Sequence, residues 1–144
     1  MLKISNTAVL RVQTDPRLTF EEKVKLIDKA FEKDDALDYA KEAEKIALET
    51  KDKLKIQDVR NMLMRLYSEK GKLYGNHAVE MALSFGEFIS DIQKAELIRQ
   101  GTIAATSAKT ALKYCDRRED REIIREDLQK YKQNLEKFRK IKTY

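Results

Sequence analysis

Turn-forming and chemically reactive residues are scarce in this chain. Its 144 residues include one Pro, four Gly, one Cys and one His, and Trp is absent. Few Pro and Gly residues disfavour a sheet with tight turns, whereas a charged content of 38% is typical of helices with solvated outer faces. We therefore expect an all-α fold of stacked antiparallel helix pairs, either as an α-solenoid or as an irregular six-helix bundle.

The residues that most enzymes and metal sites require are isolated in the sequence. His77 is the only histidine and Cys115 the only cysteine, so neither a Cys-x-x-Cys or His-x-x-x-His spacing nor an intramolecular disulfide can form. A glycine-rich phosphate loop is absent as well. We expect His77 on the surface and Cys115 as a small buried group. The expectation is a non-enzymatic protein with no catalytic residue, metal or cofactor.

Long apolar runs are also absent. No stretch approaches the roughly 18 apolar residues that cross a bilayer, and residues 1–12 lack the continuous apolar segment of a signal peptide. We therefore expect a cytoplasmic protein with no membrane partner.

Basic residues are concentrated at one end of the chain. The formal net charge is +5, and the segment 130–144 holds Glu136 as its only acidic residue. Its basic residues are Lys130, Lys132, Lys137, Arg139, Lys140 and Lys142. Two interpretations are open. The cluster is a solvated helix end that is stabilised near the C-terminal dipole, or it is a patch that contacts nucleic acid or an acidic protein.

Local signals predict the first elements. The only proline, Pro16, indicates a turn after an N-terminal arm or short helix over 1–18. Thr19 and Glu22 have the spacing of a capping box. Apolar residues at intervals of three and four then predict a helix over 20–33.

Two further helices follow in the same way. Asp34-Asp35 offers an N-cap for a helix over 36–51, whose apolar face is mostly alanine. A helix over 56–70 is expected to stop at Gly71.

The middle of the chain is predicted to contain shorter helices. Gly75 offers a turn before a helix over 77–88. Ser90 then begins a second capping-box signature. We expect the segment 91–114 to form two helices that are broken near Gly101.

The last predicted helix, over 117–141, has a different apolar period. Its stripe follows 4-3-4-3 spacing, which is typical of a helix laid along a partner helix. The stripe consists of Ile124, Leu128, Tyr131, Leu135 and Phe138. Two roles are open for this helix: a lid on the preceding helices, or the interface of a homodimer.

Small residues recur at fixed places in the chain. An Ala-Leu pair occurs three times, at intervals of 35 and 29 residues, and each pair follows small residues seven and four positions before its Ala. The pairs are Ala47-Leu48, Ala82-Leu83 and Ala111-Leu112. Small residues at regular intervals allow neighbouring helices to approach closely, as in stacked helix pairs.

This pattern resembles the tetratricopeptide repeat (TPR) family. The resemblance is carried by the run from Leu63 through Tyr67, Gly71 and Gly75 to Ala82-Leu83 and extends over roughly 20–115. The chain departs from the family because it lacks Trp and has no Pro at the end of any second helix. The resemblance implies a concave groove, lined by the first helix of each pair, that holds a peptide or helix of another protein.

The candidate partner-binding residues are polar or aromatic side chains on the first helices, away from the packing stripe. They are Arg60, Asn61, Met64, Arg65, Tyr67, Gln93, Lys94 and Arg99. Asn61 and Arg65 could hydrogen-bond a peptide backbone or carboxylate.

We expect three regions: an N-terminal arm over 1–18, a TPR-like repeat domain over 19–116, and a basic amphipathic helix over 117–144 that packs on the repeats. The leading functional hypothesis is a protein-interaction module, which would be an adaptor, a scaffold or chaperone-like. The alternatives are a nucleic-acid-associated regulatory protein that uses the basic helix, which we consider less favoured, and a self-assembling helical subunit.

Overall fold

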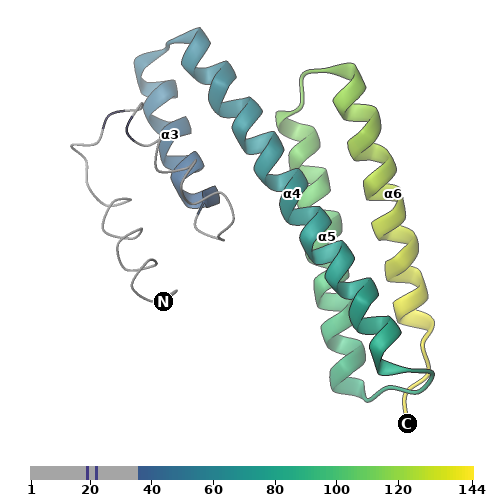
Figure 1. Ribbon diagram of the computed structural model, residues 1–144. Helices are drawn as coiled ribbons and strands as arrows, with labels where there is room; N and C mark the ends of the chain where they lie inside the picture. The colour runs from purple at the N-terminus through teal and green to yellow at the C-terminus, as the bar shows by residue number, and fades with distance from the viewer. Residues whose placement is uncertain (1–18, 20–21, 23–35) are drawn as a thin grey trace. The chain divides into compact units, whose positions relative to one another are not determined.

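The computed structural model describes Thr19, Glu22 and residues 36–144 (Figure 1). This part of the chain contains four helices: α3 (Ala36–Thr50), α4 (Lys53–Phe85), α5 (Asp91–Tyr114) and α6 (Arg118–Lys140). Within it, strand-like pairing is limited to one isolated parallel bridge between Ile89 and Thr143. The all-α class with packed helix pairs is confirmed.

The chain divides into two compact units, Met1–Leu66 and Tyr67–Tyr144. The boundary falls within α4, and each unit is described by itself. The predicted arm over 1–18, the helix over 20–33 apart from Glu22, and the cap at Asp34-Asp35 lie outside the described residues.

Thr19 and Glu22 form half of the predicted capping box. The backbone N–H of Glu22 donates to the Thr19 hydroxyl oxygen over 3.2 Å. The hydroxyl in turn donates to Glu22 Oε1 over 3.3 Å. The carboxylate therefore accepts from the hydroxyl of Thr19, whereas a full capping box directs it to the Thr19 amide.

In the first unit, α3 forms as predicted and buries a face of small residues. Its buried positions are Ala36, Leu37, Tyr39, Ala40, Ala43 and Ala47. The helix ends at Thr50, and Lys51 turns the chain with a left-handed φ of 56°. Asp52 then caps α4, because its Oδ1 accepts the N–H groups of Leu54 at 3.0 Å and Lys55 at 3.3 Å.

α4 is one continuous helix where two were predicted. The expected stop at Gly71 and the expected turn at Gly75 are wrong, since both residues lie inside Lys53–Phe85. The helix ends instead before Gly86, whose φ of 83° is left-handed. A glycine in this conformation is a common terminator of helices.

α5 is also continuous, and the predicted break near Gly101 is wrong. The helix begins with the predicted capping box at Ser90. The N–H of Gln93 donates to Ser90 Oγ over 3.1 Å, and the N–H of Ser90 donates to Gln93 Oε1 over 2.9 Å.

The three misread glycines mark places where helices of the second unit approach closely. A Cβ atom added at Gly75 would lie 2.5 Å from Tyr131 Cε1, and one added at Gly101 would lie 2.8 Å from Leu135 Cδ2. A helical glycine costs about 1 kcal/mol relative to alanine. The helices accept this cost because larger residues would keep α6 away from α4 and α5.

The recurring small residues are mostly buried, in each of the two units. Ala40, Ala104 and Ala111 are fully buried. The Leu of the repeated pair is instead exposed at Leu48 and Leu83. The small-residue pattern thus reports close helix packing. The tetratricopeptide resemblance stays a prediction, and the turns that its repeat register required at Gly71 and Gly101 are absent.

α6 closes the second unit by packing along α5. The predicted stripe is buried, with all five residues from Ile124 to Phe138 that follow the 4-3-4-3 spacing in the core. Burial within the chain confirms intramolecular packing of this helix. On the outer face, Arg118 and Glu122 form the kind of weak i, i+4 ion pair that the mixed charges suggest, with Nε 3.6 Å from Oε1.

The α5–α6 turn is held by one arginine. Arg121 Nη1 donates to the carbonyl oxygen of Leu112 over 3.0 Å and to that of Cys115 over 2.9 Å. The last carbonyls of a helix have no partner within it, so Arg121 satisfies two acceptors at the end of α5.

At the opposite end of the unit, a cluster of apolar side chains fills the space near the α4–α5 turn. Ala78, Ile89, Leu97 and Phe138 form a buried cluster. Met81, Ala82, Phe85, Ile98 and Ile141 pack against it. The C-terminal residues join this end, because the N–H of Tyr144 donates to the Ile89 carbonyl over 3.3 Å.

Among the described helices, none combines the length and the apolar character needed to cross a membrane.

Candidate functional site

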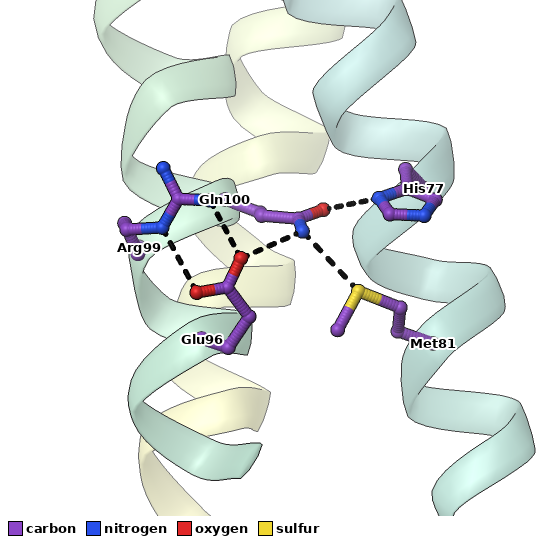
Figure 2. Close-up of polar contacts among 5 residues, drawn as sticks. All are labelled: His77, Met81, Glu96, Arg99 and Gln100. Carbon is purple, nitrogen blue, oxygen red and sulfur yellow. Dashed lines mark hydrogen bonds and ion pairs between the residues drawn. The ribbon is translucent and has the colours of Figure 1, made fainter. Parts of the chain in front are cut away.

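A polar network joins α4 to α5 in the second unit (Figure 2). Its centre is the amide of Gln100, which is only 5% exposed. Gln100 Oε1 lies 2.7 Å from His77 Nδ1, while Gln100 Nε2 donates to Glu96 Oε1 over 3.0 Å and to Met81 Sδ over 3.2 Å. Because an amide oxygen only accepts, His77 Nδ1 carries the proton in this bond.

Arg99 completes the network from the outside. Its Nε donates to Glu96 Oε2 over 2.9 Å and its Nη2 to Glu96 Oε1 over 2.6 Å. These two bonds, followed by the Gln100 bond, lower the pKa of Glu96 from 4.5 to about 2. The same pairing raises the pKa of Arg99.

The network is built to hold helices together. Burying the Gln100 amide without hydrogen-bond partners would be costly. The amide has three partners: His77 and Met81 on α4, and Glu96 on α5. The hydrogen bond that the structure gives the His77 imidazole goes to the neutral amide of Gln100.

Cys115 lies far from this imidazole. It is buried at the end of α5, some 15 residues or about 22 Å along the helix from Gln100. Burial raises the pKa of its thiol, which keeps it in the unreactive protonated form. This agrees with the expected small buried group.

Two hollows flank the outer face of α5. The larger, of about 480 Å³, lies between α5 and α6. Thr102, Thr106 and Lys109 from α5 and Lys132, Glu136 and Arg139 from α6 are among its lining residues. All six side chains are exposed, and they give the hollow an excess of positive charge.

The smaller hollow, of about 240 Å³, lies between α4 and α5. Its lining includes Tyr67, Lys70 and Ile103, together with the same Thr102 and Thr106 that line the larger one. The two threonines therefore form a low ridge with a hollow on each side, which we call the threonine ridge.

Tyr67 is held in place by an aromatic stack. Its ring centroid lies 6.1 Å from that of Tyr114, and the two ring planes differ by 5°. Parallel stacking fixes both rings at the end of α5. Tyr67 is the one predicted partner-binding residue that lines either hollow on α5.

The predicted partner-binding residues divide between the two units. In the first unit, Asn61 and Arg65 are exposed, while Arg60 and Met64 are half-buried. Asn61 Oδ1 accepts a hydrogen bond from Gln57 Nε2 over 3.0 Å.

In the second unit, three of the predicted residues have partners within the chain. Gln93 belongs to the capping box, Lys94 Nζ donates to the Ile141 carbonyl over 2.9 Å, and Arg99 pairs with Glu96. Tyr67 stacks on Tyr114, some 20 residues or about 30 Å along α5 from Lys94. The structure therefore does not bring these four together into one groove.

The predicted basic patch is exposed at every position. Its members are Lys130, Lys132, Lys137, Arg139, Lys140 and Lys142. Lys132 and Arg139 line the larger hollow, whereas the others do not. The patch therefore has two parts with different surroundings.

The threonine ridge and Lys109 were missed from the sequence. A signal was present, because Thr102, Thr106 and Lys109 follow i, i+4, i+7 spacing on one helical face. The predicted break at Gly101 interrupted the register at this point. Glu96 and Gln100 were missed because nothing in the local sequence indicates that Gln100 meets His77 and Met81 of α4.

Comparison with protein-family models, curated proteins and solved structures finds no significant match to this chain. Among the described residues, no group of three or more His, Cys, Asp or Glu side chains is placed to hold a metal ion.

Proposed function

We propose that this chain is a non-enzymatic protein-interaction module of the cytoplasm, acting as an adaptor, a scaffold or a chaperone-like protein. It binds a peptide or helix of a partner over the outer face of α5. The observation that carries the proposal is the threonine ridge with a hollow on each side. Ligand and peptide sites are commonly concave, and a helix can lie in such a groove.

The chemistry of the second unit supports a binding role over a catalytic one. His77 is bonded to a neutral amide, and Cys115 is buried far from it with a raised thiol pKa. An acid–base or nucleophilic pair would need these groups within hydrogen-bond reach.

Site-specific photo-crosslinking tests the proposal. A benzophenone amino acid replaces Thr106 on the ridge or, as a control, Lys130 on the other side of α6, and each full-length protein is irradiated in nuclease-treated lysate of the source cells. We expect the Thr106 position to capture a discrete protein that the Lys130 position does not. Capture of the same proteins from both positions, or of none from Thr106, would contradict the proposal.

Nucleic-acid association is the second candidate, because all six residues of the basic patch are exposed. Removing residues 130–144 is not a clean test, since it also deletes core residues such as Leu135 and Phe138. Replacing the six basic residues with Gln leaves the core intact. Salt-sensitive binding of an oligonucleotide that disappears in this variant would support the alternative.

Self-assembly through the stripe of α6 is less favoured by the packing. Ile124, Leu128 and Tyr131 are each at most 9% exposed within the chain itself. A homodimer through these residues would first have to release them from the core. A molar mass that rises with concentration in light scattering would support it.

A further inference from the structure

The threonine ridge is low enough for another helix to approach closely. Thr102 Oγ1 donates to the Ile98 carbonyl over 2.7 Å. A hydroxyl that donates back to its own helix does not donate to a partner. The ridge therefore consists of two short side chains, and the hydroxyl proton of Thr102 is already engaged.

One edge of the ridge is basic. Lys109, Lys132 and Arg139 line the larger hollow with Glu136 as the only acidic residue. In the described part of the chain, none of the three cations forms an ion pair. Their charges remain available to a partner of opposite sign.

The other edge of the ridge is largely apolar. Tyr67 and Ile103 line the smaller hollow, and Tyr67 is already fixed by its stack on Tyr114. An aromatic ring that is ordered before binding loses little conformational entropy when a partner covers it.

We infer that the occupant of this surface is an acidic amphipathic helix of another protein. This inference rests on the proposed function and names the chemistry of the partner. The apolar edge of the helix covers Tyr67 and Ile103, and its acidic edge faces Lys132 and Arg139. These two cations are seven residues apart on α6, or about 10.5 Å, which matches carboxylates two turns apart on the partner.

Glu136 favours a protein partner over a nucleic acid at this hollow. It lies between Lys132 and Arg139 in sequence and lines the same hollow. A partner helix can place a Lys or Arg opposite this carboxylate. A phosphate backbone carries negative charge throughout and would be repelled there.

The test uses synthetic peptide helices of about 16 residues, roughly 24 Å long, on the full-length protein. All share one leucine edge, and the adjacent edge carries Glu, Gln or Lys. Affinity is measured by fluorescence anisotropy, and the contact surface is mapped by amide chemical shifts. We expect the Glu peptide to bind about tenfold more tightly than the Gln peptide, with shifts along 102–109 and 129–139.

Charge reversal provides a matched pair of variants. Lys132→Glu with Arg139→Glu reverses the groove cations, and Lys130→Glu with Lys137→Glu makes the same charge change at the same spacing on the other side of α6. We expect the groove pair to weaken the Glu peptide about tenfold and the control pair to change it less than about twofold. The groove variant should also prefer the Lys peptide, which a misfolded protein could not do.

Several outcomes would overturn the inference. Equal binding of the Glu and Gln peptides would show that the partner need not be acidic. It would not contradict binding of a helix at this surface, and thus the proposed function would stand. Equal weakening by both charge-reversed pairs, with tighter binding of a duplex or single-stranded oligonucleotide, would assign the cations to nucleic acid. Failure of all three peptides to bind would also overturn the inference, while photo-crosslinking from Thr106 would still report on the proposed function.

Discussion

In the middle of the second unit, the ring of Tyr131 lies against Gly71 and Gly75, whereas at the end beside the α4–α5 turn Phe138 packs among Ile89 and Leu97. In the first region, a large side chain packs directly against the backbone of two glycines. The second fills its space mainly with large apolar side chains, together with Ala78 and Ala82. The middle should therefore be sensitive to added atoms, and the end should be sensitive to atoms removed.

The largest expected effect comes from a large-to-small substitution in the buried cluster at the end of the unit. Leu97 is fully buried, so Leu97→Ala should lower the free energy of unfolding by about 2–5 kcal/mol. Chemical denaturation followed by circular dichroism measures the change. Leu83→Ala makes the same substitution at a side chain that is 80% exposed and should stay within about 0.5 kcal/mol. Equal losses of unfolding free energy in the two variants would contradict the expectation that this end of the unit is sensitive to the removal of buried atoms.

A substitution that adds a methyl group in the middle of the unit should have the next largest effect. Gly75→Ala places a Cβ 2.5 Å from the ring of Tyr131, which is itself buried. We expect a loss of about 1–3 kcal/mol from overpacking, partly offset by the gain of about 1 kcal/mol in helix propensity.

Tyr131, which packs against Gly75, provides the control for that substitution. In a Tyr131→Leu background the obstructing ring atoms are gone, so Gly75→Ala should become neutral or stabilising. A double-mutant cycle by urea denaturation measures this coupling. Additive effects would show that the ring does not limit the approach of α6 to α4.

The smallest expected effect lies between the two regions, at the network around Gln100. The pKa of Glu96 is lowered to about 2, so its ionised form stabilises the fold above the ordinary pKa of 4.5 and this contribution is lost as the pH falls toward 2. Glu96→Gln should therefore be less stable than the parent at pH 7, and the difference should shrink between pH 4.5 and 2. Thermal melts across this range measure it, with Glu126→Gln, at an exposed position on α6, as the control. A difference that does not depend on pH would mean that the charge of Glu96 plays no part.

The comparison also explains which parts of the fold could be predicted from the sequence. The stripe of α6, the alanine face of α3 and the cap at Ser90 depend on local spacing, and all three are confirmed. The breaks at Gly71 and Gly101 were wrong because a glycine that turns the chain and one that admits a neighbouring helix look the same in sequence. Only the position of Tyr131 or Leu135 in space distinguishes them.

The candidate site was less predictable than the fold. Tyr67 was anticipated, but the residues opposite it come from α5 and α6, and their meeting depends on how these helices pack. Gln93, Lys94 and Arg99 were chosen as polar residues on a free face, yet they cap a helix, hold the C-terminal residues and pair with Glu96. Polarity alone did not separate binding residues from those that complete the fold.

The turn held by Arg121 bears on the order in which the second unit assembles. α5 and α6 are joined by three residues, 115–117, so their pairing closes a short loop at little cost in chain entropy. Bringing Gly71 to Tyr131 encloses about sixty residues and is entropically dearer unless the α5–α6 hairpin is already in place. We therefore expect the α5–α6 turn, with the two carbonyls bound by Arg121, to form before Tyr131 packs against the glycines of α4.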